Sequence, residues 1–233
     1  MVIPATRRAA ALLLALPFLH PHGSQDSAGR FAQGRVVESL PAILPLRLRA
    51  DASNRILRER LEDLLPSLMR EAGIDLWLVV NREANEDPVY LTLVPEPVFF
   101  ARRTTILVFH DRGPKVGIER LTVSRYPIGT LYQSSWSGGS DDEQWARLAE
   151  IVKERDPKKI GIDVSRDWAY GDGLSAGLRD RLMEALGPLR ERCVSAEDLC
   201  IRWLEPLARR ARGSIRRSLG SPDRSSRRPS AIG

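Results

Sequence analysis

The chain contains few of the residues on which most protein active sites depend. Among its 233 residues there are three histidines, His20, His22 and His110, and two cysteines, Cys193 and Cys200. This scarcity limits serine-hydrolase triads and dinuclear metal sites, which normally need a histidine beside carboxylates. The two cysteines match no metal-binding spacing. We expect both to be free thiols in the core, because a bridge to a helical Cys200 is geometrically awkward.

Long apolar runs are also scarce. Residues 9–19, AAALLLALPFL, form one that is too short to cross a bilayer, and no other stretch is expected to span a membrane. Because Arg7 and Arg8 precede this run, residues 1–30 are typical of a secretory signal peptide, which predicts a periplasmic or secreted protein. The alternative is a disordered or wrongly started N-terminus on a cytoplasmic protein.

Positive charge is abundant but concentrated at one end of the chain. The formal net charge is +6, and residues 207–233 carry eight arginines and one aspartate, which leaves the rest of the chain at −1. The body therefore lacks the basic surface that nucleic-acid binding requires, and we expect no nucleic-acid partner. Salt-sensitive binding through the tail alone is a weaker alternative.

Hydrophobic periodicity between these ends predicts interleaved helices and strands. Helices are expected over 54–72, with a kink at Pro66, over 141–155, over 175–186 and after Ser195. Short apolar runs predict strands at 74–80, 104–110, 116–124, 159–165 and 193–195, the second and third forming an antiparallel hairpin. The predicted fold class is α/β, with a mixed sheet flanked by helices in one domain over 35–206, followed by a basic disordered tail over 207–233.

The stretch GLSAG, residues 173–177, fits the Gly-x-Ser-x-Gly pattern of a nucleophile elbow. Eight residues separate Leu174 from the preceding predicted strand, although an elbow needs a strand that runs directly into the turn. Every histidine also precedes Ser175, whereas the base follows the serine in that hydrolase fold. We therefore interpret Ser175 as a helix N-cap whose hydroxyl accepts from first-turn amides, and His110 as a structural residue.

The connection NREANEDPVYLTLVPEPVFFARRTT, residues 81–105, is the most unusual segment of the chain. It joins two predicted core strands and yet is rich in charge, and long connections of this kind are often functional. Adjacent arginines suit a carboxylate partner. A surface loop held by internal salt bridges is the alternative. The candidates for a substrate cleft or an interface are Asn85, Glu86, Asp87, Arg102 and Arg103.

The same segment, followed by ERLTVSRYPIG, IGIDVS and GDGLSAGLRDRL, resembles the N-terminal domain of creatinase/prolidase-type metallopeptidases, which include bacterial Xaa-Pro aminopeptidases. The resemblance covers about residues 52–205 and implies a mixed sheet of ribonuclease-H-like topology. In that family a "pita-bread" catalytic domain follows and binds two divalent metals. The N-terminal domain contributes to the dimer and roofs the substrate cleft, and it supplies few or no metal ligands.

The sequence departs from this family after IRWLE, residues 201–205, where the catalytic domain would begin. The remaining 28 residues are dominated by Arg, Ser, Pro and Gly and have no apolar periodicity, a composition that suggests a frameshift or truncation. We therefore expect an accessory domain without catalytic residues, metal or cofactor of its own. It would form a homo-oligomer or pair with a pita-bread domain. The alternatives are a stand-alone dimerisation or binding module and a serine hydrolase.

Overall fold

The computed structural model describes residues 45–205, so the predicted signal peptide and basic tail lie outside the described residues. Within this range the helices are α1 (Leu46–Glu59), α2 (Leu65–Ala72), α3 (Tyr90–Leu93), α4 (Asp141–Arg155), α5 (Ala176–Leu186) and α6 (Glu197–Leu204). The strands are β1 (Leu76–Arg82), β2 (Thr104–Asp111), β3 (Ile118–Ser124), β4 (Gln133–Ser134), β5 (Ile160–Ile162) and β6 (Cys193–Ser195). None of the described helices is long and apolar enough to cross a membrane.

The strands form one six-stranded mixed sheet in the order β4-β3-β2-β1-β5-β6. Strand β2 runs antiparallel to β1 and β3, whereas β5 and β6 run parallel to β1. This arrangement of β3, β2, β1, β5 and β6 agrees with the ribonuclease-H-like topology that the resemblance implied. The predicted α/β class, with a mixed sheet flanked by helices, is confirmed.

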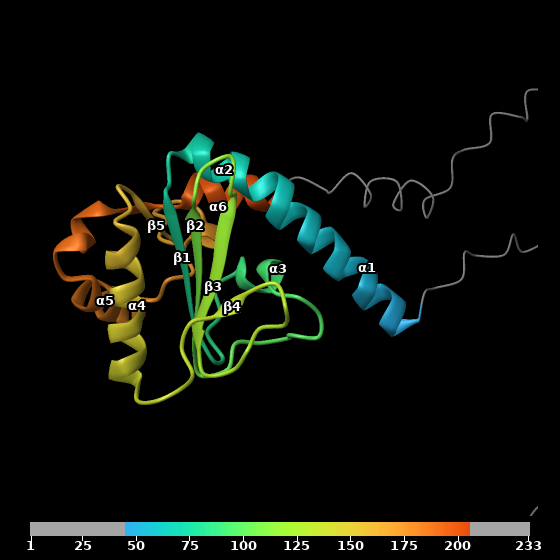
Figure 1. Cartoon of the computed structure of the whole chain (residues 1–233), viewed down its shortest axis with the longest axis horizontal. Coiled ribbons are helices and arrows are strands. Elements are labelled where there is room, and N and C mark those ends of the chain that lie inside the picture. The colour runs from blue at the N-terminus through green and yellow to red at the C-terminus, as the bar shows by residue number, and fades with distance from the viewer. Residues whose placement is uncertain (1–44, 206–233) are drawn as a thin grey trace, which may run out of the picture. The chain divides into compact units, whose positions relative to one another are not determined.

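Helices lie on both faces of the sheet (Figure 1). Alternating side chains of the strands divide the core into two layers, one on each face. In β1, Trp77 and Val79 pack beneath α2, α3 and α6, whereas Leu76, Leu78 and Val80 pack beneath α4 and α5. The central strands are apolar on both sides because helices cover both faces.

The first helical segment begins at Leu46, eight residues before the predicted start. A π-helical turn, Arg60–Leu64, separates α1 from α2 and ends two residues before Pro66. Proline has no N–H group to donate, and a π-turn accommodates that loss within a continuous helical segment. The expected disturbance at Pro66 is therefore present as a π-turn on its N-terminal side.

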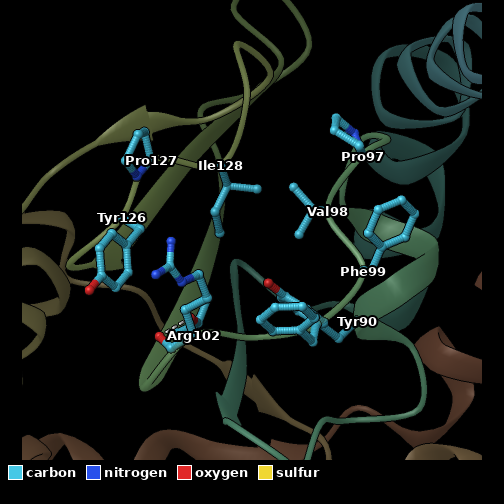
Figure 2. Close-up of a pocket in the computed structure, with 10 residues that line it drawn as sticks. Tyr90, Pro97, Val98, Phe99, Arg102, Tyr126, Pro127 and Ile128 are labelled. Atoms are coloured by element: carbon cyan, nitrogen blue, oxygen red, sulfur yellow. Dashed lines mark hydrogen bonds between the residues drawn. The ribbon is translucent and has the colours of Figure 1, made fainter. Parts of the chain in front are cut away.

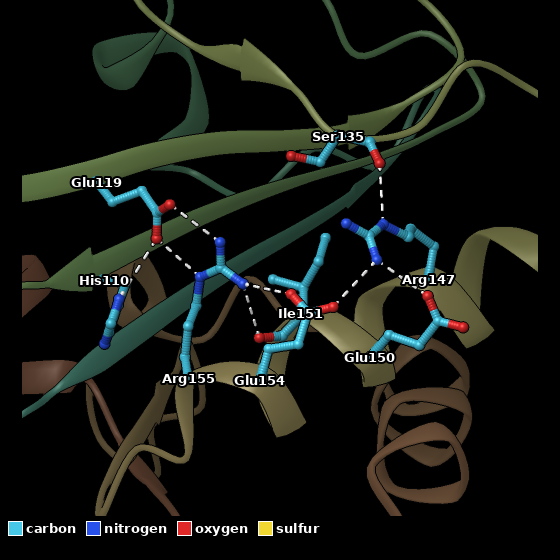
Figure 3. Close-up of polar contacts among 8 residues, drawn as sticks. All are labelled: His110, Glu119, Ser135, Arg147, Glu150, Ile151, Glu154 and Arg155. Atoms are coloured by element: carbon cyan, nitrogen blue, oxygen red, sulfur yellow. Dashed lines mark hydrogen bonds and ion pairs between the residues drawn. The ribbon is translucent and has the colours of Figure 1, made fainter.

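Helix α4 begins with a capping box and is joined to the sheet by an ion pair near its other end. Ser140 and Glu143 form the predicted capping box. At the other end the Arg155 guanidinium donates to both carboxylate oxygens of Glu119 on β3, at 2.7 and 3.0 Å, and His110 Nδ1 lies 3.4 Å from the same carboxylate (Figure 3). The hydrogen bonds from Arg155 hold the pKa of Glu119 below its usual range. His110 is thus part of this structural contact.

Candidate functional site

The connection from β1 to β2 borders a largely apolar pocket of about 310 Å³ (Figure 2). One wall consists of Val98, Phe99 and Phe100, and the opposite wall consists of Pro127 and Ile128 from the segment after β3. The two phenylalanine side chains are 66% and 52% exposed, although phenylalanine is usually buried. This exposed aromatic segment provides an apolar surface for binding.

Arg102 supplies the positive charge of the pocket. Its guanidinium lies 3.9 Å from the centroid of the Tyr126 ring, a cation–π contact that holds the side chain at the pocket (Figure 2). Among the described residues, no carboxylate forms an ion pair with Arg102. An oriented guanidinium beside an apolar wall suits a ligand or partner that carries both a carboxylate and an apolar group.

Arg103 lines a neighbouring, more polar pocket of about 390 Å³ together with Arg125 and Trp136. Its backbone is left-handed, with φ of 57°, which is uncommon for a residue other than glycine. Two contacts with Glu83 hold this conformation: Arg103 N–H donates to the Glu83 carboxylate at 3.1 Å, and Glu83 N–H donates to Arg103 O at 2.9 Å. The left-handed residue turns the side chains of Arg102 and Arg103 toward different pockets.

Two other predicted site residues shape the connection rather than the pocket. Asn85 closes a tight turn, in which its N–H donates to Arg82 O at 2.9 Å. The Glu86 carboxylate accepts from Ala101 N–H at 3.1 Å and so ties the start of the connection to its end. Glu86 also influences the buried phenol of Tyr90, whose pKa is raised to about 12, chiefly by burial.

Asp87 lies inside the domain. It is 2% exposed and interacts with Asp163, which directly follows β5 and is 1% exposed. Burial raises the pKa of Asp87 to about 6 and that of Asp163 well above its usual range. The five predicted residues therefore separate: Arg102 and Arg103 line pockets, Asn85 and Glu86 brace the connection, and Asp87 is buried.

Ser175 is the N-cap residue of α5, as predicted, but the expected hydrogen bond from its hydroxyl is absent. Its Oγ is buried and has no hydrogen-bond partner among residues 45–205. No hydrogen bond joins it to His110 in the described range, since the contact of His110 is with Glu119. Gly173 of this motif is packed closely against Asp87. A Cβ at this position would lie 2.0 Å from Asp87 Oδ2 and 2.8 Å from Asp87 Cα.

The acid pair does not fit two divalent metals of the kind that the resembling family binds in its catalytic domain. In the described part of the chain, no cluster of three or more His, Cys, Asp or Glu side chains could hold a metal ion. Asp163 Oδ1 already accepts from Trp77 Nε1 at 2.6 Å and from Cys200 Sγ at 3.3 Å. A dinuclear centre needs several further ligands, so no step of a reaction is assigned to this pair.

The sequence interpretation missed Phe99, Phe100 and Asp163. The two phenylalanines are adjacent and lie in a proline-containing connection, a setting in which both rings are hard to bury, and that was an available signal. The sequence signal for Asp163 was weaker, since Asp163 is an acidic residue that directly follows the apolar strand IGI. Its pairing with Asp87 has no local signature, because 76 positions separate the two residues.

No protein-family model matches this chain, and no curated protein matches it. A search of solved structures finds a Xaa-Pro dipeptidase from Bacillus anthracis, 17% identical, with a TM-score of 0.38. The alignment covers 64% of this chain and 34% of the dipeptidase, so the chain spans about a third of that protein.

Proposed function

We propose that the domain is the accessory N-terminal domain of a Xaa-Pro aminopeptidase-like metallopeptidase. In this role it supplies a binding surface and has no hydrolytic activity of its own. The observation that carries the proposal is the exposed aromatic segment Phe99–Phe100 beside the Arg102 pocket. The resemblance of residues 52–205 to such domains supplies the identity of the partner, a pita-bread catalytic domain.

The composition of this surface supports a protein partner. Adjacent exposed aromatic side chains are uncommon on a surface that only water contacts, and aromatic residues with arginine dominate the energetics of protein interfaces. Leu91, which is 53% exposed, adds to the apolar area on the same connection. A catalytic domain that covers this surface would bury the two rings and present a carboxylate, its own or that of its peptide substrate, to Arg102.

The first test examines the chain itself and the DNA that follows the codon for Glu205. We expect the purified chain to show no metal-dependent hydrolysis of Xaa-Pro peptides in Mn²⁺, Co²⁺ or Zn²⁺. We expect the downstream DNA to encode a catalytic domain in another reading frame. Metal-dependent turnover by the chain, or the lack of such a coding region, would overturn the proposal.

The second test examines the surface. Calorimetry with the catalytic domain encoded downstream should show binding that Phe99→Ser with Phe100→Ser weakens at least about tenfold, since each is a buried aromatic contact in the complex. Val116→Ser is a matched control, because Val116 is 62% exposed but lies in the β2–β3 turn. An equal loss in both variants would contradict the assignment. Self-association of the chain through the same rings, without binding to the catalytic domain, would identify a dimerisation module instead.

A further inference from the structure

Asp87 and Asp163 join the candidate-site connection to the opposite half of the sheet. Asp87 lies on the connection between β1 and β2, five residues after the end of β1. Asp163 directly follows β5, whose backbone pairs with β1 and β6. A contact between these two carboxyl groups therefore fixes the position of the connection that carries Tyr90 and Arg102.

Each carboxyl group has one satisfied oxygen and one unsatisfied oxygen. Asp87 Oδ1 accepts from Val89 N–H at 2.9 Å, and Asp163 Oδ1 accepts from Trp77 and Cys200. The Oδ2 atoms of both residues are buried and have no donor among the described residues. Buried polar atoms without a partner are rare in folded proteins, and here two of them belong to interacting carboxyl groups.

No positive charge compensates the pair. Within residues 45–205, no arginine, lysine or histidine forms an ion pair with Asp87 or Asp163. The other titratable groups that act on them are Asp172, a third acid, and the Cys200 thiol of α6, whose own pKa is raised by burial. Two buried carboxylates in contact cannot both be ionised without a large cost in free energy.

The backbone of Gly173 closes the remaining side of the pair. A side chain at this position would overlap Asp87 Oδ2 and approach Asp87 Cα. Leu174 N–H donates to Asp163 O at 2.9 Å, so the segment that follows Gly173 is also bound to Asp163. Three segments distant in the sequence therefore meet at the two carboxyl groups.

We propose that Asp87 and Asp163 form a proton-dependent clasp, in which one proton shared between their Oδ2 atoms holds the β1–β2 connection closed. Loss of that proton leaves two carboxylates in contact, and their repulsion releases the connection together with the pocket wall. The clasp thus binds a proton, and loss of that proton increases the mobility of residues 88–103. The clasp goes beyond the proposed function and does not depend on it.

The sign of the pH dependence follows from proton linkage. The folded state binds protons at the pair more tightly than the unfolded chain does, so the stabilisation is complete below the unfolded pKa of about 4. It is lost as the pH rises through the raised pKa values of the pair, that of Asp87 at about 6 and then that of Asp163, which releases the shared proton. The rise in the pKa of Asp87 alone, from 3.8 to about 6, corresponds to an increase of about 100-fold in the unfolding equilibrium constant, and the raised pKa of Asp163 extends the loss of stability to higher pH.

Urea unfolding of the full chain between about pH 4 and pH 8 tests the clasp, with Asp163→Asn as the decisive variant. The amide of the variant keeps an acceptor for Trp77 and gives Asp87 Oδ2 a permanent donor. We expect the wild type to lose at least about 100-fold in folding equilibrium constant over this range. The variant should lose clearly less, because its amide donor favours the Asp87 carboxylate although burial still raises the pKa of Asp87. Asp172→Asn is the matched control: it removes a nearby acid outside the pair and should retain most of the wild-type dependence.

Hydrogen exchange, corrected for intrinsic rates, supplies the local readout. In the wild type, residues 88–103 should exchange faster as the pH rises, whereas the Asp163→Asn variant should keep them protected. If that variant fails to fold, Asp87→Asn and carboxyl ¹³C titration of the wild type replace it. Titration of both carboxyls near pH 4, or a wild-type stability that does not fall between about pH 4 and pH 8, would overturn the clasp.

Discussion

Buried polar groups are hydrogen-bonded differently on the two faces of the sheet, one beneath α4 and α5 and the other beneath α2 and α6. On the first face, Gln144 is 2% exposed and its amide donates to two backbone carbonyls, Thr104 O at 2.9 Å and Val123 O at 2.7 Å. On the second face, Asp87 and Asp163 keep one unsatisfied oxygen each. The buried amide on the face beneath α4 and α5, the packing face, is thus paired, whereas the face beneath α2 and α6, the polar face, holds two carboxyl groups with one unpaired oxygen each.

The largest expected effect tests the packing face. Leu148 of α4 is fully buried among aliphatic side chains, so Leu148→Ala should lower the free energy of unfolding by about 2–5 kcal/mol. The loss should be the same at acidic and neutral pH, because no titratable group is involved. Urea unfolding at both values measures it, and a loss that differed by more than about 1 kcal/mol would show that the two faces are coupled.

The next largest effect is expected for Gly173, which packs against Asp87 on the polar face. Gly173→Ala should lower the free energy of unfolding by about 1–3 kcal/mol or more, because the new methyl group overlaps Asp87. Gly177→Ala is the control: it lies in α5 with nothing within 4 Å of the added methyl, and it should raise stability by about 0.5–1 kcal/mol. Thermal unfolding distinguishes the two, and equal shifts would mean that Asp87 can move aside.

The smallest effect concerns the ion pair between β3 and α4. Glu119→Gln should lower the free energy of unfolding at neutral pH by about 1 kcal/mol, because the variant loses the charge-assisted bonds from Arg155. The pKa of Glu119 is lowered on folding, so its contribution is present above the unfolded pKa and disappears as the pH falls through the folded one.

The stability from Glu119 is lost at low pH, whereas that from the clasp is lost at high pH, so a pH series separates the two contributions. Below the lowered folded pKa of Glu119, the wild type and Glu119→Gln should converge in urea unfolding. A gap that persisted there would show that Glu119 acts through its shape and not through its charge.

The sheet could be predicted from the sequence because its strands are short apolar runs with regular side-chain alternation. The beginning of the first helix could not, since LRLRADAS lacks a clear apolar stripe and Leu57 is the first residue of α1 to be buried. The two-residue β4 and four-residue α3 are too short to have a period of their own. Each of these elements depends on tertiary contacts.

The sequence predicted which segment carries the candidate site, but it did not predict how the side chains of that segment are arranged. Its charge between two buried strands identified the connection, and Arg102 does line a pocket. The inward position of Asp87 depends on the close approach of Gly173, which is 86 positions away. Sequence analysis gave Gly173 no role of its own, because local patterns contain no information on which distant residue approaches it.

Helix α6 completes the core layer that it forms with α2 and α3, and it is the last described helix to be synthesised on the ribosome. Trp203 is fully buried, receives a cation–π contact from Arg60 at 4.2 Å, and donates from Nε1 to Thr92 Oγ1 at 2.8 Å. Cys200 of the same helix donates to Asp163. The nascent chain therefore cannot close this layer until its last described helix has left the exit tunnel, and until then the earlier helices and the acid pair remain open to chaperones and proteases.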